Sequence, residues 1–169
     1  RVVTALQDKD SYLDRYSANR NVFYGIAEAD LTDNTMLTVG MQYQENKTDS
    51  PLWGALPLVY SDGSPTNYDV STSTATDWSY WNTKEKRGFI ELSHALANDW
   101  KLKSSFTHID FSQDSELFYV YGEPDKNTGL GLYSYPSAYT GANQQNIADI
   151  NLSGPFQLFG REHQLATGA

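Results

Sequence analysis

Residues 37–44 read Leu37-Thr38-Val39-Gly40-Met41-Gln42-Tyr43-Gln44, and they decide the fold class because apolar side chains alternate with small or polar ones. Successive side chains of a β-strand point to opposite faces, so this stretch has one apolar face and one polar face. The same period-two alternation returns in the stretch that begins at Trp100 and in the stretch that begins at Ala148. The chain is therefore predicted to be all-β and antiparallel.

The connections between these stretches are of two kinds. Asp33-Asn34 and Ala97-Asn98-Asp99 are compact turn sequences, because Asn and Asp tolerate left-handed backbone conformations. Residues 48–80 and 113–143 carry no strand pattern and exceed the roughly 12–15 residues usual for loops in compact domains. Tight periplasmic turns that alternate with long extracellular loops are typical of bacterial outer-membrane barrels.

The expected strands are also long enough for a membrane. They run for about a dozen residues, beyond the roughly 5–6 of globular sheets and above the roughly 9–11 that a tilted strand needs to cross a bilayer. Trp100 beside a short turn and Tyr43 near a long loop occupy the positions of aromatic girdles, and Phe156 and Phe159 fit the same belt.

The number of strands points to a section of something larger. About seven strands cannot close a bacterial barrel, which uses an even number from about eight upward. The chain opens at Arg1 without a signal region and stops at Ala169 in what reads as the beginning of a strand. We expect residues 1–169 to be one part of a barrel domain, with the remaining strands and other domains absent.

Composition excludes several classes of function. Lys and Arg number 12 against 21 Asp and Glu, and a net charge of -9 repels nucleic acid. The absence of Cys excludes disulfides, iron–sulfur clusters and thiol catalysis. No apolar run approaches the roughly 20 residues of a transmembrane helix.

No catalytic or metal-binding residue is predicted. The three histidines are spread along the chain without metal-ligand spacing, and no nucleophile or phosphate-loop motif occurs. Two carboxylates at a suitable separation are enough for a glycosidase, but the acidic residues here are more simply read as a solvated surface. These are Asp110, Asp114, Glu116, Glu123 and Asp125.

Aromatic residues gather in the two expected long loops. The first holds Trp53, Tyr60, Tyr68, Trp78, Tyr80 and Trp81, and the second holds Tyr119, Tyr121, Tyr133, Tyr135 and Tyr139. Rigid amphipathic rings on loops suit the capture of a bulky ligand at a small entropic cost, although single rings also serve to pack loops into lids. The predicted ligand-binding residues are Trp53, Tyr119, Tyr121, Trp78 and Trp81. Trp53 follows a Ser-Pro step and precedes Gly54, so we expect a turn that displays its ring.

Short motifs along nearly the whole chain carry a resemblance to a known family. They are Ser11-Tyr12-Leu13-Asp14-Arg15-Tyr16, Asp30-Leu31-Thr32, Gly40 with Tyr43-Gln44, Trp53-Gly54-Ala55-Leu56-Pro57, Asp62-Gly63, Trp78 with Trp81, Phe89 with Leu92 and His94, Gly154-Pro155-Phe156, and Phe159-Gly160-Arg161. In their order and spacing the chain resembles the TonB-dependent siderophore receptors of Gram-negative outer membranes, within them the ferric hydroxamate branch, and most of all receptors for ferric coprogen or rhodotorulic acid.

The resemblance implies a 22-stranded transmembrane barrel in a bacterial outer membrane, closed by an N-terminal plug and energised by the TonB complex. This chain holds neither the plug nor a TonB-binding segment, so that partner would bind through a missing N-terminal region. The expected ligand is a ferric siderophore, whose own oxygens hold the iron, and no cofactor bound by protein ligands is expected. Trp53 is the first residue carried over as a ligand contact. The apolar face that carries Leu37, Val39 and Met41 is expected to meet outer-membrane lipid.

Two other readings stay open at this point. A soluble carbohydrate-binding β-sandwich explains the alternation and uses the same aromatic residues, but it accounts for neither the one-sided loops nor the strand lengths. A barrel enzyme such as an outer-membrane hydrolase is the weaker alternative. Dependence on detergent separates the receptor from the sandwich, and a turnover assay separates it from the enzyme.

Overall fold

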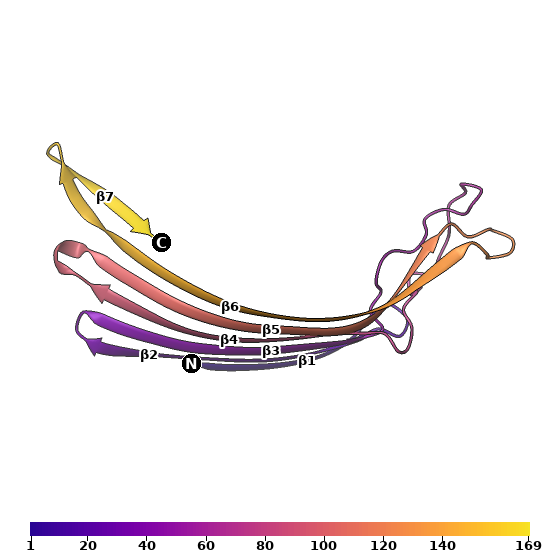
Figure 1. The fold of residues 1–169 in the computed structure, drawn as a ribbon, viewed down its shortest axis with the longest axis horizontal. Helices are drawn as coiled ribbons and strands as arrows, with labels where there is room; N and C mark the ends of the chain where they lie inside the picture. Colours follow the sequence, from indigo (N-terminus) through magenta and orange to yellow (C-terminus); the bar gives the residue numbers. More distant parts are fainter.

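One antiparallel sheet makes up most of the molecule in the computed structural model, which describes residues 1–169 (Figure 1). Its seven strands pair in chain order, so each strand lies beside its neighbour in sequence. The elements are β1 (Val2–Asp10), β2 (Ser17–Thr32), β3 (Thr35–Asp49), β4 (Tyr80–Ala95), the 3-10 turn η1 (Ala97–Asp99), β5 (Lys101–Gly122), β6 (Leu132–Leu158) and β7 (Arg161–Gly168). The predicted all-β architecture of about seven strands is confirmed.

Short connections join the strands at one end of the sheet and longer ones at the other (Figure 1). At the short-turn end, Asn98 and Asp99 have φ angles of 59° and 62°, and Phe159 in the last turn has a φ of 50°. Asn and Asp adopt this left-handed conformation more readily than most residues, which is why the turn at 97–99 was visible in the sequence. At the other end lie residues 11–16, 50–79 and 123–131.

The predicted loop at 113–143 is wrong, because most of it belongs to strands. β5 has 22 residues and β6 has 27, and only residues 123–131 separate them. The tyrosines at 119, 121, 133, 135 and 139 therefore lie on strands, not on a mobile loop. In this part of β5 the convex side carries the polar residues Ser112, Asp114 and Glu116, while Ser115 and Leu117 on the concave side are buried. Backbone pairing therefore continues although the apolar convex face that marks a strand in sequence has ended.

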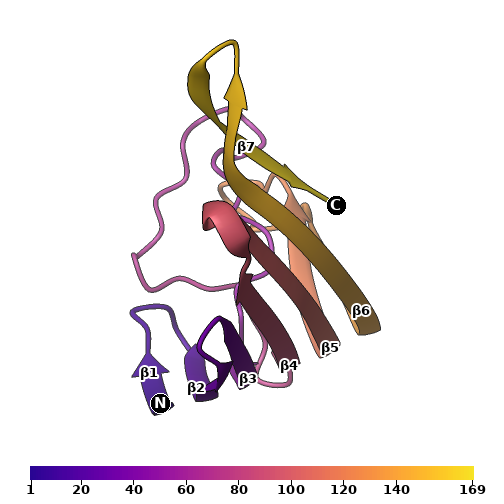
Figure 2. The ribbon, with the colours of Figure 1, turned by 90° about the vertical axis from the view of Figure 1, so that its left-hand side faces the viewer.

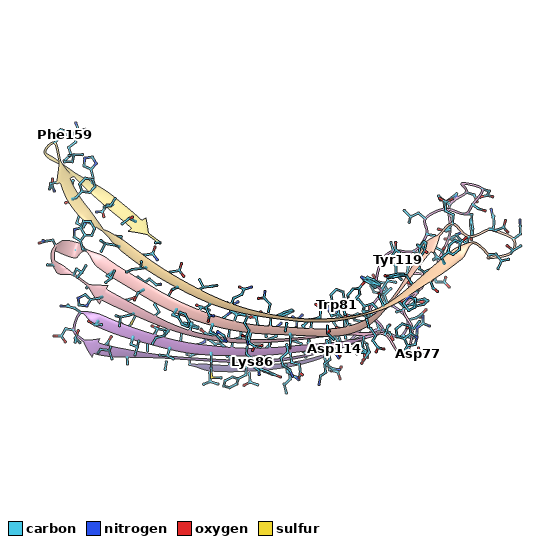
Figure 3. All side chains as sticks on the ribbon, viewed as in Figure 1. Asp77, Trp81, Lys86, Asp114, Tyr119 and Phe159 are labelled. Atoms are coloured by element: carbon cyan, nitrogen blue, oxygen red, sulfur yellow. The ribbon has the colours of Figure 1, made fainter.

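The two faces of the sheet differ in polarity, and the register identifies them. Residues paired directly across antiparallel strands share a face. One row on the convex face is Ala27, Val39, Ile90, Phe106 and Ala148, and the next row on the concave face is Glu28, Thr38, Glu91, Ser105 and Asp149. Figure 3 shows Lys86, which shares the face of Val39, on the convex side and Trp81 on the concave side.

Large apolar side chains on the convex face have no protein over them. Val39, Met41, Ile90 and Phe106 are 46%, 54%, 45% and 44% exposed. Only two apolar residues of the whole chain are buried, Ala75 and Leu117. A β-sandwich needs a second sheet to cover its apolar face, and all seven strands here belong to one sheet, so the soluble sandwich is not favoured.

The convex apolar band crosses the strands obliquely. Toward the loops it ends at Tyr43 on β3, before Glu45, but at Ala148 on β6, before Asn146. Ala148 is level with Val39, so the boundary moves by four residues between β3 and β6. In a barrel whose strands tilt by about 45°, a boundary parallel to the membrane shifts along each successive strand. With strands about 4.8 Å apart and a rise of about 3.4 Å per residue, the shift is about 1.4 residues per strand, or about four residues over three strands. The step matches the tilt of strands that cross a membrane.

Aromatic rings mark both edges of this band. The ring of Trp100 lies on Gly154, where an added Cβ would come within 2.4 Å of it, and Phe156 stacks on His163 with 5.4 Å between ring centroids. Tyr43 is at the opposite edge, on the same face. Phe159 is 94% exposed at the tip of the last turn (Figure 3). The positions agree with the girdles expected from the sequence.

Within the sheet the backbone is satisfied by its own pairing, since 85 of 102 backbone hydrogen bonds lie inside regular elements. Such internal pairing is what a hydrocarbon environment requires of a chain. No helix of the structure combines the length and the apolar character needed to cross a membrane. Figure 2 shows β1 to β6 side by side in order, with the loop of residues 50–79 standing away from them.

Candidate functional site

Five aromatic rings form a continuous cluster near the loop end of the concave face. Trp53 meets Tyr119 and Tyr139 edge-on, each with 5.8 Å between centroids. Tyr119 stacks on Tyr121 at 5.9 Å, and Tyr121 stacks on Tyr133 at 5.6 Å. Edge-to-face and offset-stacked pairs at these separations are the favourable geometries for aromatic rings. We call Trp53, Tyr119, Tyr121, Tyr133 and Tyr139 the aromatic cluster.

The β5–β6 hairpin positions four of these rings. Tyr119 and Tyr121 are two residues apart on β5, so they point to the same face. Tyr133 is paired directly with Tyr121, and Tyr139 is paired with Ser115 on that same face. Figure 3 places Tyr119 on the concave side of the sheet, close to the loops. The rings are therefore held by a continuous strand ladder and not by a flexible segment.

The fifth ring, Trp53, is brought to the cluster by the first turn of the long loop. Ser50 is buried with a φ of 47°; its N–H donates to the Ser79 carbonyl at 2.8 Å and its hydroxyl donates to the Thr76 carbonyl at 3.0 Å. Gly54 has a φ of 92°, and a Cβ there would lie 2.0 Å from the Tyr119 ring. Only glycine allows the chain to pass so close to that ring.

The expectation that the Trp53 ring is freely displayed is wrong. The ring is half-buried and packs within the aromatic cluster, against the rings of Tyr119 and Tyr139. The open surface of the cluster is provided mainly by Tyr121, Tyr133 and Tyr139, which are 46%, 63% and 42% exposed. These side chains present ring faces and phenol groups to whatever enters from the loop end.

The structure brings together three of the five predicted ligand-binding residues, Trp53, Tyr119 and Tyr121. Trp81 lies on the same concave face, paired with Thr48 and Ser115, and is 37% exposed. Trp78 lies apart from them: its ring packs edge-on against Phe118 at 5.9 Å, and Phe118 points to the convex face.

Sequence reasoning left Tyr133 and Tyr139 out of the predicted site. Both were noted as aromatic residues of an expected loop, where no partner can be assigned. The signal that points to them is the pairing of the two strands, because the hairpin register sets Tyr133 opposite Tyr121. A strand prediction for residues 132–143 is what would assign Tyr133 and Tyr139 to the same face as Tyr121.

The tip of the long loop is joined to the tip of the β5–β6 hairpin. The Ser61 N–H donates to the Pro124 carbonyl at 3.0 Å, and the Lys126 ammonium lies 5.8 Å from the centre of the Tyr60 ring. Two carboxylates organise these tips. Hydrogen bonds from Ser64 hold the pKa of Asp62 below its usual value, and hydrogen bonds from Thr128 and Asn127 do the same for Asp125.

The histidines and acidic residues build no metal centre in this structure. No group of three or more His, Asp or Glu side chains is arranged to hold a metal ion. His94 is hydrogen-bonded to Thr35 at 2.8 Å and His108 to Asn146 at 2.8 Å, as expected of strand residues.

A hollow of about 470 Å³ lies at the short-turn end, away from the aromatic cluster. Its lining is mostly polar and includes Asp30, Lys103 and Asn151 of the concave face. It is separated from the cluster by the whole length of the strands, so the two are different places on the molecule (Figure 1).

Comparison with known proteins gives a consistent result over the whole chain. No family model matches it. A ferric-pyoverdine BN7/BN8 receptor of Pseudomonas putida is 37% identical over 168 residues, which are 99% of this chain and 21% of that receptor. The crystal structure of the outer-membrane ferripyoverdine receptor of Pseudomonas aeruginosa bound to ferripyoverdine has a TM-score of 0.90 and 37% identity over 99% of this chain and 22% of that one. A pyocin S2 complex of FpvAI matches with the same TM-score of 0.90.

These similarities decide several expectations. The predicted fold, a section of an outer-membrane receptor barrel, and the predicted location in a bacterial outer membrane are confirmed. The similar proteins are receptors, which agrees with the prediction that no residue is catalytic. The expected likeness to coprogen receptors finds no support, because the names of these relatives carry pyoverdine. The chain spans about a fifth of the length of the receptors it matches, and over that span it is similar to their barrel.

Proposed function

We propose that this chain is part of the wall and extracellular loops of a receptor that captures a ferric siderophore of the pyoverdine class and imports it with energy supplied through TonB. The aromatic cluster is the observation that supports this most directly. It lies on the concave face at the loop end, where a ligand from outside first meets the lumen, and the similar receptors are named for ferric pyoverdine.

The chemistry of the cluster suits such a ligand. A siderophore surrounds its iron with its own oxygens, so the protein contributes surface complementarity and not metal ligands. Rings fixed on paired strands lose little freedom when they bind, and phenol groups add hydrogen bonds at the ring edges. The proposed contacts are Trp53, Tyr119, Tyr121 and Trp81, joined by Tyr133 and Tyr139. The proposed receptor carries out no covalent chemistry, and its convex band faces lipid.

The test is Trp53→Ala in the full-length receptor. Truncating a central aromatic anchor costs about 2 kcal/mol, so the affinity for ferric pyoverdine should fall roughly thirtyfold. Trp78→Ala is the matched control, since that tryptophan comes from the same loop but packs on the convex face, and its affinity should stay within about twofold. Binding is measured by fluorescence quenching, together with iron-limited growth.

A second arm separates the siderophore classes. Ferric coprogen, offered to the same receptor, should neither quench fluorescence nor support growth at concentrations at which ferric pyoverdine does. Wild-type affinity in Trp53→Ala with normal surface expression would refute the site. Tight binding of ferric coprogen with none of ferric pyoverdine would refute the substrate class.

A further inference from the structure

The loop between β1 and β2, residues 11–16, lies at the same end of the sheet as the long loop and holds its returning half. The Asp14 N–H donates to the Ser71 carbonyl at 2.8 Å. The Arg15 guanidinium donates to the Ser73 carbonyl at 2.9 Å and lies 3.7 Å from the Asp77 carboxylate. One arginine thus reaches across from a separate hairpin to two points of residues 71–77, which we call the return limb.

Arg15 occupies a backbone position that does not favour a long side chain. Its φ is 69°, in the left-handed region that glycine and asparagine adopt with the least strain. Asparagine in this place would keep the turn but would be too short to reach Ser73. The contacts with Ser73 and Asp77 therefore depend on the arginine side chain, while the shape of the turn and the backbone hydrogen bond from Asp14 to Ser71 do not.

The return limb connects Arg15 to Ser50, which begins the segment that carries Trp53. The Ser73 hydroxyl accepts from the N–H of the buried Ala75 at 3.1 Å, which makes a compact turn. The carbonyl of Thr76, one residue further, accepts from the Ser50 hydroxyl at 3.0 Å. Ser50 begins the segment that presses Gly54 and Trp53 against Tyr119.

We propose that Arg15 is a positioning residue for the aromatic cluster: by fastening the return limb it holds Ser50, and through it Trp53, in the arrangement that binds ligand. The inference rests on the proposed function for its ligand, but the mechanical link stands on contacts of its own. Without Arg15, only a fraction of the receptor molecules hold Trp53 in the arrangement that binds ligand. The apparent affinity for the ligand is then the intrinsic affinity multiplied by that fraction.

The hydrogen bond to Ser73 carries this link, and the ion pair contributes little. The Asp77 side chain is 90% exposed and that of Arg15 42%, and exposed ion pairs at such separations are screened by water and salt. Asp77→Asn therefore removes the ion pair and leaves the link intact, which makes it the matched control for Arg15→Asn.

The experiment uses the full-length receptor with a spin label on a cysteine introduced at Val70, which is 84% exposed beside the return limb. This chain has no cysteine of its own that would react. A second label at Asp33, at the short-turn end, is the reference. Arg15→Asn should raise the mobility at position 70 but not at position 33, while Asp77→Asn should change neither.

Ligand binding gives the second readout. Arg15→Asn should lower ferric-pyoverdine affinity about three- to tenfold through slower association, with an unchanged dissociation rate, as expected when only part of the population is competent. Arg15→Lys keeps one donor and should recover part of the affinity. Unchanged mobility at position 70 in Arg15→Asn, or raised mobility with wild-type association, overturns the inference. Raised mobility in a receptor whose wild type binds no ferric siderophore refutes the proposed function and leaves the mechanical link standing.

Discussion

An arginine at position 39 tests which face of the sheet meets lipid. Val39 is in the middle of the convex apolar band, between Leu37 and Met41 and level with Ile90. An arginine facing lipid at the bilayer midplane costs about 2–4 kcal/mol of barrel stability. Val39→Arg should therefore lower the folding equilibrium constant of the receptor about 30- to 900-fold.

Two arginines on the concave face are the matched controls. Gln42→Arg, three residues away, puts its charge opposite Arg87, and like charges directly across a sheet cost about 0.2–1 kcal/mol. Ser105→Arg comes between Glu91 and Asp149 on the neighbouring strands and should be neutral or slightly stabilising. The expected order of stability is Ser105→Arg, then Gln42→Arg, then Val39→Arg.

The assay is guanidinium unfolding of the full-length receptor folded in lipid vesicles, with the free energy of unfolding taken by linear extrapolation. The comparison among the three variants is informative because each introduces the same side chain on a strand. If Val39→Arg and Gln42→Arg cost the same within about 0.5 kcal/mol, or if Ser105→Arg is the costliest, the assignment of the faces is wrong.

Three further outcomes are expected. Residues 1–169 expressed alone should form inclusion bodies or need detergent, since β1 and β7 have unpaired edges and the convex band is uncovered; a monodisperse monomer in plain buffer would contradict the membrane assignment. Gly54→Ala should weaken ferric-pyoverdine binding at least as much as Trp53→Ala, because its Cβ would meet the Tyr119 ring at 2.0 Å and its φ is 92°; equal affinity to wild type would show that the turn is adaptable. The pKa of Asp125 is lowered in the folded hairpin tip, so its stabilising effect is present above the unfolded value of about 4 and is lost as pH falls through the lower folded-state value; the protection of the Thr128 amide against hydrogen exchange, relative to the intrinsic rate at each pH, should therefore fall below about pH 4, and Asp125→Asn should abolish that dependence.

The sequence alone was sufficient for the fold class and the orientation of the strands. Alternation in residues 37–44 places the apolar side chains on the uncovered convex face of β3 and the small or polar ones on the concave face, so the pattern follows directly from the strand period. The turn at 97–99 was visible because Asn98 and Asp99 belong to the few residue types that adopt left-handed backbone positions readily. The turn at 33–34 was visible because Asp and Asn are common turn residues, and there the Asn34 N–H donates to the Thr32 hydroxyl at 3.3 Å. The strands within 113–143 were missed because the convex face is polar there and the concave face is covered by the long loop, so the apolar convex face seen in residues 37–44 does not continue.

The tertiary structure decided which aromatic residues act together. Tyr121 and Tyr133 stack because the register of β5 on β6 sets them opposite each other, and register depends on the whole hairpin and not on either residue. Trp78 and Trp81 are three residues apart, yet Trp78 packs on the convex face and Trp81 lies on the concave one. Composition can show that a chain is rich in rings, but the face of each ring follows from strand pairing, which is a long-range property of the folded sheet.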